Sequence, residues 1–240
     1  MTTLCFDFGN TRLKCAVMKD GHFEEELTLE RIDMPVLEKL LSSYQPKKTI
    51  LASVIHHDER IESLLASASS FHKLTHQSRL NFSIATGKPQ TVGTDRLALC
   101  AAAVHLYPHQ NILVIGLGTC ITYNFVNQYH QFLGGAISPG MQLRFKSMND
   151  YTAQLPLVDA GPHQPLIGYD TPTNLQSGVV QGITGEIGHF VEKYREKFGN
   201  FNVVLTGGNS LYFASQLKNG IFADINFLYK GLYALSELNN

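Results

Sequence analysis

The chain has 240 residues, of which 44% are hydrophobic and 16% are charged, and its formal net charge is −1. This length and composition fit a globular protein with a substantial core and exclude a largely disordered chain. Lys and Arg are dispersed, the first residues lack a signal-peptide pattern, and no window approaches the roughly 20 apolar residues of a membrane span. We therefore expect a cytoplasmic protein that binds neither nucleic acid nor a membrane.

The first half of the chain begins with three predicted strands that follow one another through tight turns. They are Leu4–Phe8, Leu13–Met18 and Phe23–Leu29. Apolar residues at helical spacing then predict three helices, and a β-rich run between the first two predicts a buried strand. The helices are expected at Met34–Tyr44, Asp58–Ser69 and Leu97–Leu106, and the buried strand at Thr49–Ile55.

The second half begins in the same way, with a strand, a Gly-containing turn and two further strands. The predicted strands are Asn111–Ile115, Cys120–Val126 and Gln131–Ile137. A long helix is expected over Thr173–Phe198, and a strand over Val203–Leu205.

These two beginnings indicate an internal duplication. The segment 6–11 aligns with the segment 115–119 at the spacing of its Gly residues, and each copy is a strand, a Gly turn and a hairpin. We therefore expect an α/β fold of two similar halves, residues 1–108 and residues 109–240, with a cleft between them.

The first Gly turn, within residues 7–14, has the composition of a phosphate-binding site. Gly9 allows backbone N–H groups to approach a phosphate closely, and Asn10 and Thr11 add side-chain donors. Asp7 is suited to holding Mg²⁺, and Lys14 to neutralising a phosphoryl oxygen. A plain hairpin turn rich in Gly and Asn is the alternative.

Three further Gly segments lie in the second half. The turn Gly116-Leu117-Gly118-Thr119 repeats the first one, so that two turns would grip one phosphate chain from both sides of the cleft. The segment Thr206-Gly207-Gly208-Asn209 would let a flat ring or a ribose lie against the backbone, and residues 134–140 form a Gly/Pro loop before a helix. Taken alone, the segments 116–119 and 206–209 are better explained as structural turns, and residues 134–140 are either a simple turn or part of the pocket wall.

The segment Gly93-Thr94-Asp95-Arg96 precedes a predicted helix. Asp95 is a candidate for the carboxylate that accepts a hydroxyl proton, and Arg96 for a group that binds an anionic substrate. The alternative is that Asp95 caps the helix.

Histidine and cysteine residues give no positive sign of a metal site. Two His pairs have i, i+4 spacing without a nearby third ligand, so structural or solvated His is the favoured interpretation. The four cysteines, Cys5, Cys15, Cys100 and Cys120, lie in apolar runs, which predicts reduced, buried thiols. Neither a P-loop nor a Ser/His/Asp hydrolase arrangement is visible.

Together the motifs resemble those of type III pantothenate kinases over about residues 4–235. In chain order they are Asp7-x-Gly9-Asn10-Thr11-x-x-Lys14, Gly93-x-Asp95-Arg96, Gly118-Thr119, Gly134-Gly135-x-Ile137-x-Pro139-Gly140, Thr171 seven residues before Gly178, and Thr206-Gly207-Gly208. The resemblance implies a duplicated ribonuclease-H-like (actin/hexokinase-like) fold, a homodimer, and transfer of the γ-phosphoryl group of ATP to the 4′-hydroxyl of pantothenate. This reaction is the first step of coenzyme A biosynthesis.

The resemblance also implies roles for individual residues. Asp95 would be the general base, Gly93 and Arg96 would contact pantothenate, and Thr171, from the same subunit or from its partner, would close that site. ATP and Mg²⁺ would be held by a larger set: Asp7, Gly9, Asn10, Thr11, Lys14, Gly118, Thr119, Gly207 and Gly208. Such enzymes also use a monovalent cation, K⁺ or NH₄⁺.

Two departures from the family pattern bear on that cation. Gly116 and Asn124 stand where acidic residues are usual, and hard cations favour charged oxygen ligands, so a weakened cation site is expected. These losses motivate a second hypothesis, a non-catalytic or regulatory relative that binds nucleotide. A third is a kinase of the same fold that acts on another small hydroxylated substrate.

Overall fold

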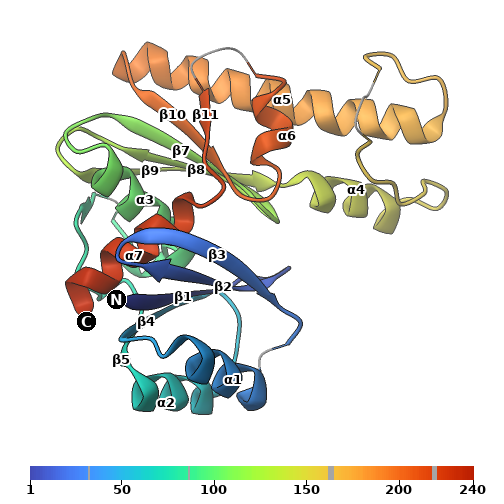
Figure 1. Ribbon diagram of the computed structural model, residues 1–240. Coiled ribbons are helices and arrows are strands. Elements are labelled where there is room, and N and C mark those ends of the chain that lie inside the picture. The colour runs from blue at the N-terminus through green and yellow to red at the C-terminus, as the bar shows by residue number, and fades with distance from the viewer. Residues whose placement is uncertain (32, 86, 162–164, 218–220) are drawn as a thin grey trace. The chain divides into compact units, whose positions relative to one another are not determined.

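The computed structural model describes residues 1–31, 33–85, 87–161, 165–217 and 221–240, and its strands form two sheets (Figure 1). The chain divides into two compact units. The first unit comprises Met1–Gln110, Asn124–Gly134 and Asn226–Asn240, and the second comprises Asn111–Tyr123 and Gly135–Ile225. The boundary near residue 108 that the duplication suggests stays a prediction.

The sheet of the first unit has five strands in the order β3-β2-β1-β4-β5. β1 pairs antiparallel with β2 and parallel with β4, so that the hairpin and the crossover meet at the central strand. The strands are β1 (Thr2–Phe8), β2 (Leu13–Lys19), β3 (His22–Leu29), β4 (Lys48–Ser53) and β5 (Ser70–Lys73).

Helices cover both faces of this sheet. On one face, α1 (Met34–Tyr44) and α2 (Glu59–Ala68) pack with β1 in one apolar cluster that includes Phe6, Leu37 and Leu65. On the other face lie α3 (Thr94–Leu106) and α7 (Phe227–Asn239), which both contact β4 and pack against each other (Figure 1). A short 3-10 turn, η1 (Pro89–Thr91), precedes α3.

The second sheet has six strands in the order β11-β10-β7-β8-β9-β6. Its strands are β6 (Ser83–Ile84), β7 (Ile112–Leu117), β8 (Cys120–Val126), β9 (Gln131–Pro139), β10 (Asn202–Thr206) and β11 (Ile221–Ala223). β10 runs parallel to both β7 and β11. The helices α4 (Met141–Asp150), α5 (Thr171–Phe198) and α6 (Ser210–Ala214) belong to the second unit.

The two sheets share one topology, which confirms the predicted duplication. The order β3-β2-β1-β4-β5 is repeated as β9-β8-β7-β10-β11, with β6 added at the far edge. In each copy three consecutive strands are followed by two that run parallel to the first. This is the topology expected of a duplicated ribonuclease-H-like fold.

Most predicted elements are confirmed within a few residues, and the errors have physical causes. The strand expected to reach Ile55 ends at Ser53, and the expected Gly/Pro loop over residues 134–140 is instead the end of strand β9 as far as Pro139. The strands β5, β6 and β11 and the helix α7 were not predicted, because the three strands are short and α7 lacks a side-chain N-cap. Cys120 is exposed, so only the other three cysteines are buried as predicted.

Within the described residues, no helix combines the length and the apolar character that crossing a membrane would require.

The contact between α3 and α7 depends on Gly231. A Cβ atom at this position would lie 1.8 Å from the carbonyl oxygen of Ala98, so the helices approach closely only because the side chain is absent. We expect Gly231→Ala to lower the free energy of unfolding by about 3 kcal/mol through overpacking, measured by urea denaturation. Gly188→Ala is the control, because Gly188 lies in α5 with open space around it, and this change should be neutral or stabilising by up to about 1 kcal/mol. Equal effects of the two changes would contradict this account of the contact.

Candidate active site

Acidic and basic side chains gather at the ends of β1 and α3 in the first unit. Asp7 is the penultimate residue of β1 and pairs across the hairpin with Lys14 of β2. The pKa of Asp7 is raised from 3.8 to about 7, chiefly because burial disfavours the charged carboxylate and then because of the nearby charge of Asp95. Lys14 acts in the opposite direction, and Glu26 adds to the rise. The structure therefore brings Asp7, Lys14 and Asp95 together, as the sequence predicts.

Glu26 is a member of this group that sequence reasoning missed. One of its carboxylate oxygens accepts from Lys14 Nζ at 2.7 Å, and the other accepts from the hydroxyl of Tyr229 at 2.7 Å. Tyr229 lies on α7 and is buried, and its pKa is raised by that burial and by Glu26. Glu26 thus bridges β2 and α7 and fixes the position of Lys14. The signal was hidden because Glu26 lies in a run of three glutamates that are all exposed, so that nothing in the sequence distinguishes it from the other two.

Asp95 lies in the first turn of α3 rather than at its cap. The N-cap is Gly93, so the helix-cap interpretation of Asp95 is wrong. The pKa of Asp95 is raised mainly by burial, while the backbone N–H and the charge of Arg96 oppose the rise. A Cβ atom on Gly93 would lie 2.5 Å from Oδ1 of Asp95, so the missing side chain makes room for this carboxylate.

Arg96 is held from the β8–β9 hairpin within the same unit. Its Nε–H donates to Oδ1 of Asn124 at 2.7 Å, and its guanidinium carbon lies 5.4 Å from the centre of the Phe132 ring. Asn124 has no exposed surface, and Phe132 is almost completely buried. Arg96 itself remains partly exposed.

The turn after β1 has the features of a phosphate-binding loop. Gly9 donates its N–H to the carbonyl of Arg12 at 3.2 Å, which closes a tight turn. Asn10 and Thr11 are exposed at its tip. The turn therefore presents backbone and side-chain donors next to Asp7 and Lys14.

The Gly turns of the second unit converge on the end of β7. Gly118 and Thr119 form the exposed turn between β7 and β8, and the N–H of Gly140 donates to the carbonyl of Thr119 at 3.0 Å. Gly207, at a φ of +92°, packs on Leu117, since a Cβ there would lie 2.7 Å from the Leu117 carbonyl oxygen. Gly208 follows and is exposed. The predicted residues Gly118, Thr119, Gly207 and Gly208 therefore lie at neighbouring turns.

Gly116 lies within β7, paired with Thr206 of β10.

Thr171 lines a cavity of about 510 Å³ between α4 and α5 of the second unit. Thr171 is the first residue of α5, which begins with a capping box between Asp170 and Thr173. Other residues lining the cavity include Arg144, Ser147, Asn174 and Gly178.

A partly buried hydrogen-bond network that includes Arg144, one of the residues lining this cavity, was also missed. Glu186 of α5 accepts from the hydroxyls of Tyr123 and Ser138 at 2.9 and 2.5 Å, and it forms an ion pair with Arg144. Burial raises the pKa of Glu186, but these donors together hold it below its ordinary value. The network joins β8, β9, α4 and α5.

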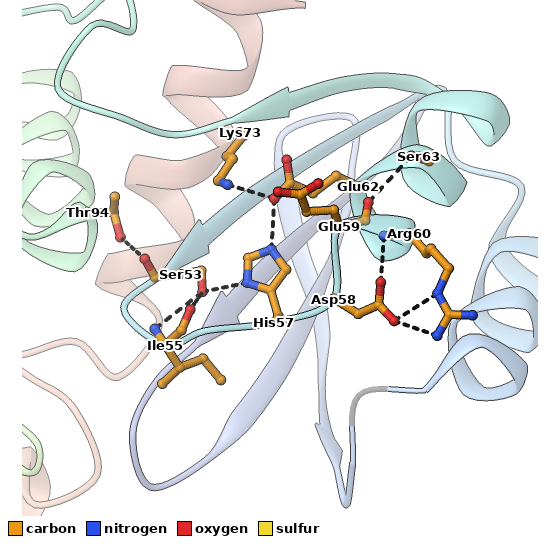
Figure 2. Close-up of polar contacts among 10 residues, drawn as sticks. All are labelled: Ser53, Ile55, His57, Asp58, Glu59, Arg60, Glu62, Ser63, Lys73 and Thr94. Carbon is orange, nitrogen blue, oxygen red and sulfur yellow. Dashed lines mark hydrogen bonds and ion pairs between the residues drawn. The ribbon is translucent and has the colours of Figure 1, made fainter.

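A chain of polar contacts braces the first unit below α3 (Figure 2). Figure 2 shows the His57 ring between Ser53 and Glu62, with the ring nitrogens 3.1 Å from Ser53 Oγ and 2.9 Å from Glu62 Oε1. Lys73 Nζ donates to the same Glu62 oxygen at 2.6 Å, and Thr94 donates to the backbone carbonyl of Ser53 at 3.3 Å. The order Ser, His, Glu resembles that of a hydrolase triad. However, the Glu62 carboxylate is paired with Lys73, and the Ser53 hydroxyl donates to the Ile55 carbonyl at 3.0 Å, so the group is structural. These contacts therefore anchor the residue before Asp95.

The donor set at Asp7 is suited to a divalent cation, because two carboxylates held close together in a partly buried site are relieved by a positive charge. Gly116 and Asn124 offer no carboxylate to a monovalent cation, and the described part of the chain holds no cluster of three or more His, Cys, Asp or Glu that could bind a metal. The residues present thus fit Mg²⁺ at Asp7 better than a monovalent cation at the other two positions.

We expect Asp7→Asn to stabilise the ligand-free protein in a pH-dependent way. Because the folded chain binds the Asp7 proton up to about pH 7 and the unfolded chain releases it near 3.8, ionisation opposes folding as the pH rises through this window. The gain should be of the order of 2 kcal/mol at pH 8 and should disappear toward pH 4. Urea denaturation at several pH values measures it, with Asp150→Asn as an exposed control. A gain that is independent of pH would contradict the assigned burial of the Asp7 charge.

Comparison with known proteins assigns the chain to a family. The sequence pattern of the family described as type III pantothenate kinase matches residues 3–193. A type III pantothenate kinase from Christiangramia forsetii is 40% identical over 238 residues, which are 98% of each chain. Another from Flavobacterium johnsoniae is 38% identical over 232 residues, which are 95% of each chain.

Two solved structures share the fold at low sequence identity. A conserved protein from Campylobacter jejuni, assigned to the Baf family of transcriptional activators, is 20% identical with a TM-score of 0.64, over 98% of this chain and 97% of its own. A glucokinase from an Antarctic psychrotroph is 13% identical with a TM-score of 0.54, over 98% of each chain. The fold is thus the duplicated ribonuclease-H-like fold of actin/hexokinase-like proteins. From its matched sequence pattern and its curated relatives, the chain belongs to the type III pantothenate kinase family.

Proposed function

We propose that this protein transfers the γ-phosphoryl group of ATP to the 4′-hydroxyl of pantothenate, the first step of coenzyme A biosynthesis. Family membership supports the reaction. The observation that carries the mechanism is the electrostatic coupling of Asp7 and Asp95 beside Lys14 in the first unit. A phosphotransferase needs a base for the acceptor hydroxyl and positive charge for the phosphoryl oxygens, and this group contains both.

Asp95 is the general base in this proposal. Its raised pKa makes it a stronger proton acceptor than an exposed aspartate, and the backbone N–H and charge of Arg96 limit that rise. In phosphoryl transfer the same carboxylate also orients the attacking hydroxyl. Gly93 leaves room for the Asp95 carboxylate at this position, because any larger residue would meet its Oδ1.

Each unit, taken by itself, supplies donors suited to the phosphates of ATP. In the first unit, the donors come from Gly9, Asn10 and Thr11, beside Lys14. In the second unit, the corresponding donors come from the duplicated turn that contains Gly118 and Thr119. Gly207 and Gly208 provide a flat backbone surface for the nucleoside. Asp7 would hold Mg²⁺, which neutralises phosphate charge when bound.

The acceptor is bound by Arg96 and Gly93, with Thr171 closing its site. Pantothenate carries a carboxylate, and a guanidinium is the side chain best suited to pair with it. We further propose a homodimer, and a cytoplasmic location that agrees with the buried thiols of Cys5, Cys15 and Cys100. K⁺ and NH₄⁺ are varied in the assay, but no step of the proposed mechanism depends on them, because Gly116 and Asn124 supply no charged ligand.

A second candidate function is a non-catalytic relative that binds nucleotide. The observation that favours it is the absence of acidic side chains at Gly116 and Asn124. Loss of one electrostatic stabiliser typically lowers a rate by about 10²–10³-fold, which weakens an enzyme without abolishing turnover. We therefore favour an active kinase.

Asp95→Asn should lower turnover at least about 10²-fold, because the amide cannot accept the hydroxyl proton. ADP release, measured with and without pantothenate at varied K⁺ and NH₄⁺, gives the rate. Calorimetry with a non-hydrolysable ATP analogue should show unchanged nucleotide binding. Full activity of the variant would reject Asp95 as the base, and absence of pantothenate-dependent turnover by the unaltered protein under every condition would favour the second candidate.

Tyr229→Phe tests the bridge that positions Lys14. Removal of the hydroxyl leaves one Glu26 oxygen without its donor, so Glu26 and Lys14 become less well fixed, and kcat/KM for ATP should fall about tenfold. Tyr44→Phe is the matched control, because Tyr44 donates in the same way to Glu25, the preceding residue, at 2.9 Å. Equal losses in the two variants would show that Lys14 is not positioned through this bridge.

A further inference from the structure

The end of β9 packs directly against the β7–β8 turn, which consists of Gly118 and Thr119. Gly140, the residue after β9, donates its N–H to the carbonyl of Thr119 at 3.0 Å. A Cβ atom on Gly140 would lie 2.2 Å from the carbonyl oxygen of Gly118, so the two backbones are in contact and no side chain fits between them. All three residues belong to the second unit. The position of the β7–β8 turn therefore depends on where β9 ends.

Two side chains hold the residues that precede Gly140. The hydroxyl of Ser138 donates to Oε1 of Glu186 at 2.5 Å, and the carbonyl of Pro139 accepts from Nε of Arg144 at 2.8 Å. Pro139 has no N–H group, so it cannot donate a backbone hydrogen bond to a neighbouring strand. The last two residues of β9 are thus fixed by side chains of α5 and α4.

Glu186 and Arg144 are themselves joined, so that these contacts form one network. The two side chains form an ion pair, and each has 21% of its surface exposed. The backbone N–H of Arg144 also donates to the carbonyl of Gly140 at 3.0 Å. Hydrogen bonds to an ionised group are roughly twice as strong as those between neutral groups. The Glu186 carboxylate therefore holds Ser138 directly and the next residue through Arg144.

We propose that Glu186 is a positioning residue for nucleotide binding. It fixes the end of β9 through Ser138 and Arg144, and the backbone of Gly140 passes this constraint to the β7–β8 turn. Backbone donors bind a phosphate tightly when they are already aimed at it, because ordering a mobile turn during binding costs affinity. The inference rests on the proposed function, which assigns the phosphates of ATP to this turn.

Nucleotide affinity is the direct readout, because it requires no turnover. Calorimetry with a non-hydrolysable ATP analogue should show a Kd raised about tenfold in Glu186→Gln, since the amide cannot neutralise Arg144. Ser138→Ala removes one hydrogen bond and keeps the ion pair, so its Kd should rise about threefold. Ser138→Thr retains the hydroxyl and should restore the unaltered value.

The effect of Ser138→Ala on turnover should be confined to one substrate. Arg144 lines the cavity that contains Thr171, whereas Ser138→Ala leaves Arg144 paired, so this variant separates the two substrates. Its KM for ATP should rise about threefold, and its KM for pantothenate should stay unchanged. A general loss of folded protein would lower kcat and leave both KM values as they are, and this result would contradict the positioning role.

Glu196→Gln is the matched control for Glu186→Gln. Glu196 lies on the same helix and pairs with Lys193 at 2.7 Å, with both side chains more than half exposed, so the same charge is removed from the surface. Its Kd should equal that of the unaltered protein. An unchanged Kd in Glu186→Gln would overturn the inference, and so would an equal loss in Glu196→Gln or a Ser138→Thr variant that behaves like Ser138→Ala.

Hydrogen–deuterium exchange of the ligand-free protein separates this inference from the proposed function. Peptides that contain the β7–β8 turn should exchange at least about threefold faster in Glu186→Gln, whereas peptides from β1 and β2 of the first unit should be unaffected. If the unaltered protein does not bind the ATP analogue, the proposed function fails. The exchange rates then still decide the positioning role, and equal rates in the turn would reject it.

Discussion

The site depends on the burial of two carboxyl groups. Burial is the chief cause that raises the pKa of both Asp7 and Asp95, and the nearby charge of Asp95 adds to the rise at Asp7. This arrangement is unfavourable for the empty protein, but it is relieved when positive charge or a proton enters. Lys14, fixed by Glu26 and Tyr229, provides part of that relief permanently. The rest of this unfavourable electrostatic energy is relieved only when positive charge or a proton enters the site. The residues that destabilise the empty protein can therefore support catalysis.

The duplicated topology explains where the functional groups occur. In both sheets the first strand ends in a Gly turn, and the strand beside it runs parallel, so turns and helix N-termini gather at one edge of each sheet. The first copy carries charged groups at this edge, whereas the second carries Gly, Thr and backbone donors. The two copies of one topology thus differ in which kind of group they present.

The sequence predicted the duplication, the long elements and the residues of the Asp7 and Asp95 segments, because these depend on local periodicity and on short motifs. It did not predict Glu26, Tyr229 or the contact of Arg96 with Asn124, since each joins residues far apart in the chain. From the sequence, Asn124 was interpreted only as the loss of an acidic cation ligand, because a single sequence shows the type of a residue and not its contacts. The chain Ser53–His57–Glu62 was missed for the same reason, although His57 follows a strand end closely (Figure 2).

The first unit is completed by the last helix of the chain. Residues 226–240 belong to it, Gly231 packs on α3, and Tyr229 reaches the site from α7. During synthesis the N-terminal sheet emerges early but lacks one of its covering helices until residues 226–240 have been made. Until then α3 lacks its packing partner, and Glu26 lacks the hydrogen bond from Tyr229.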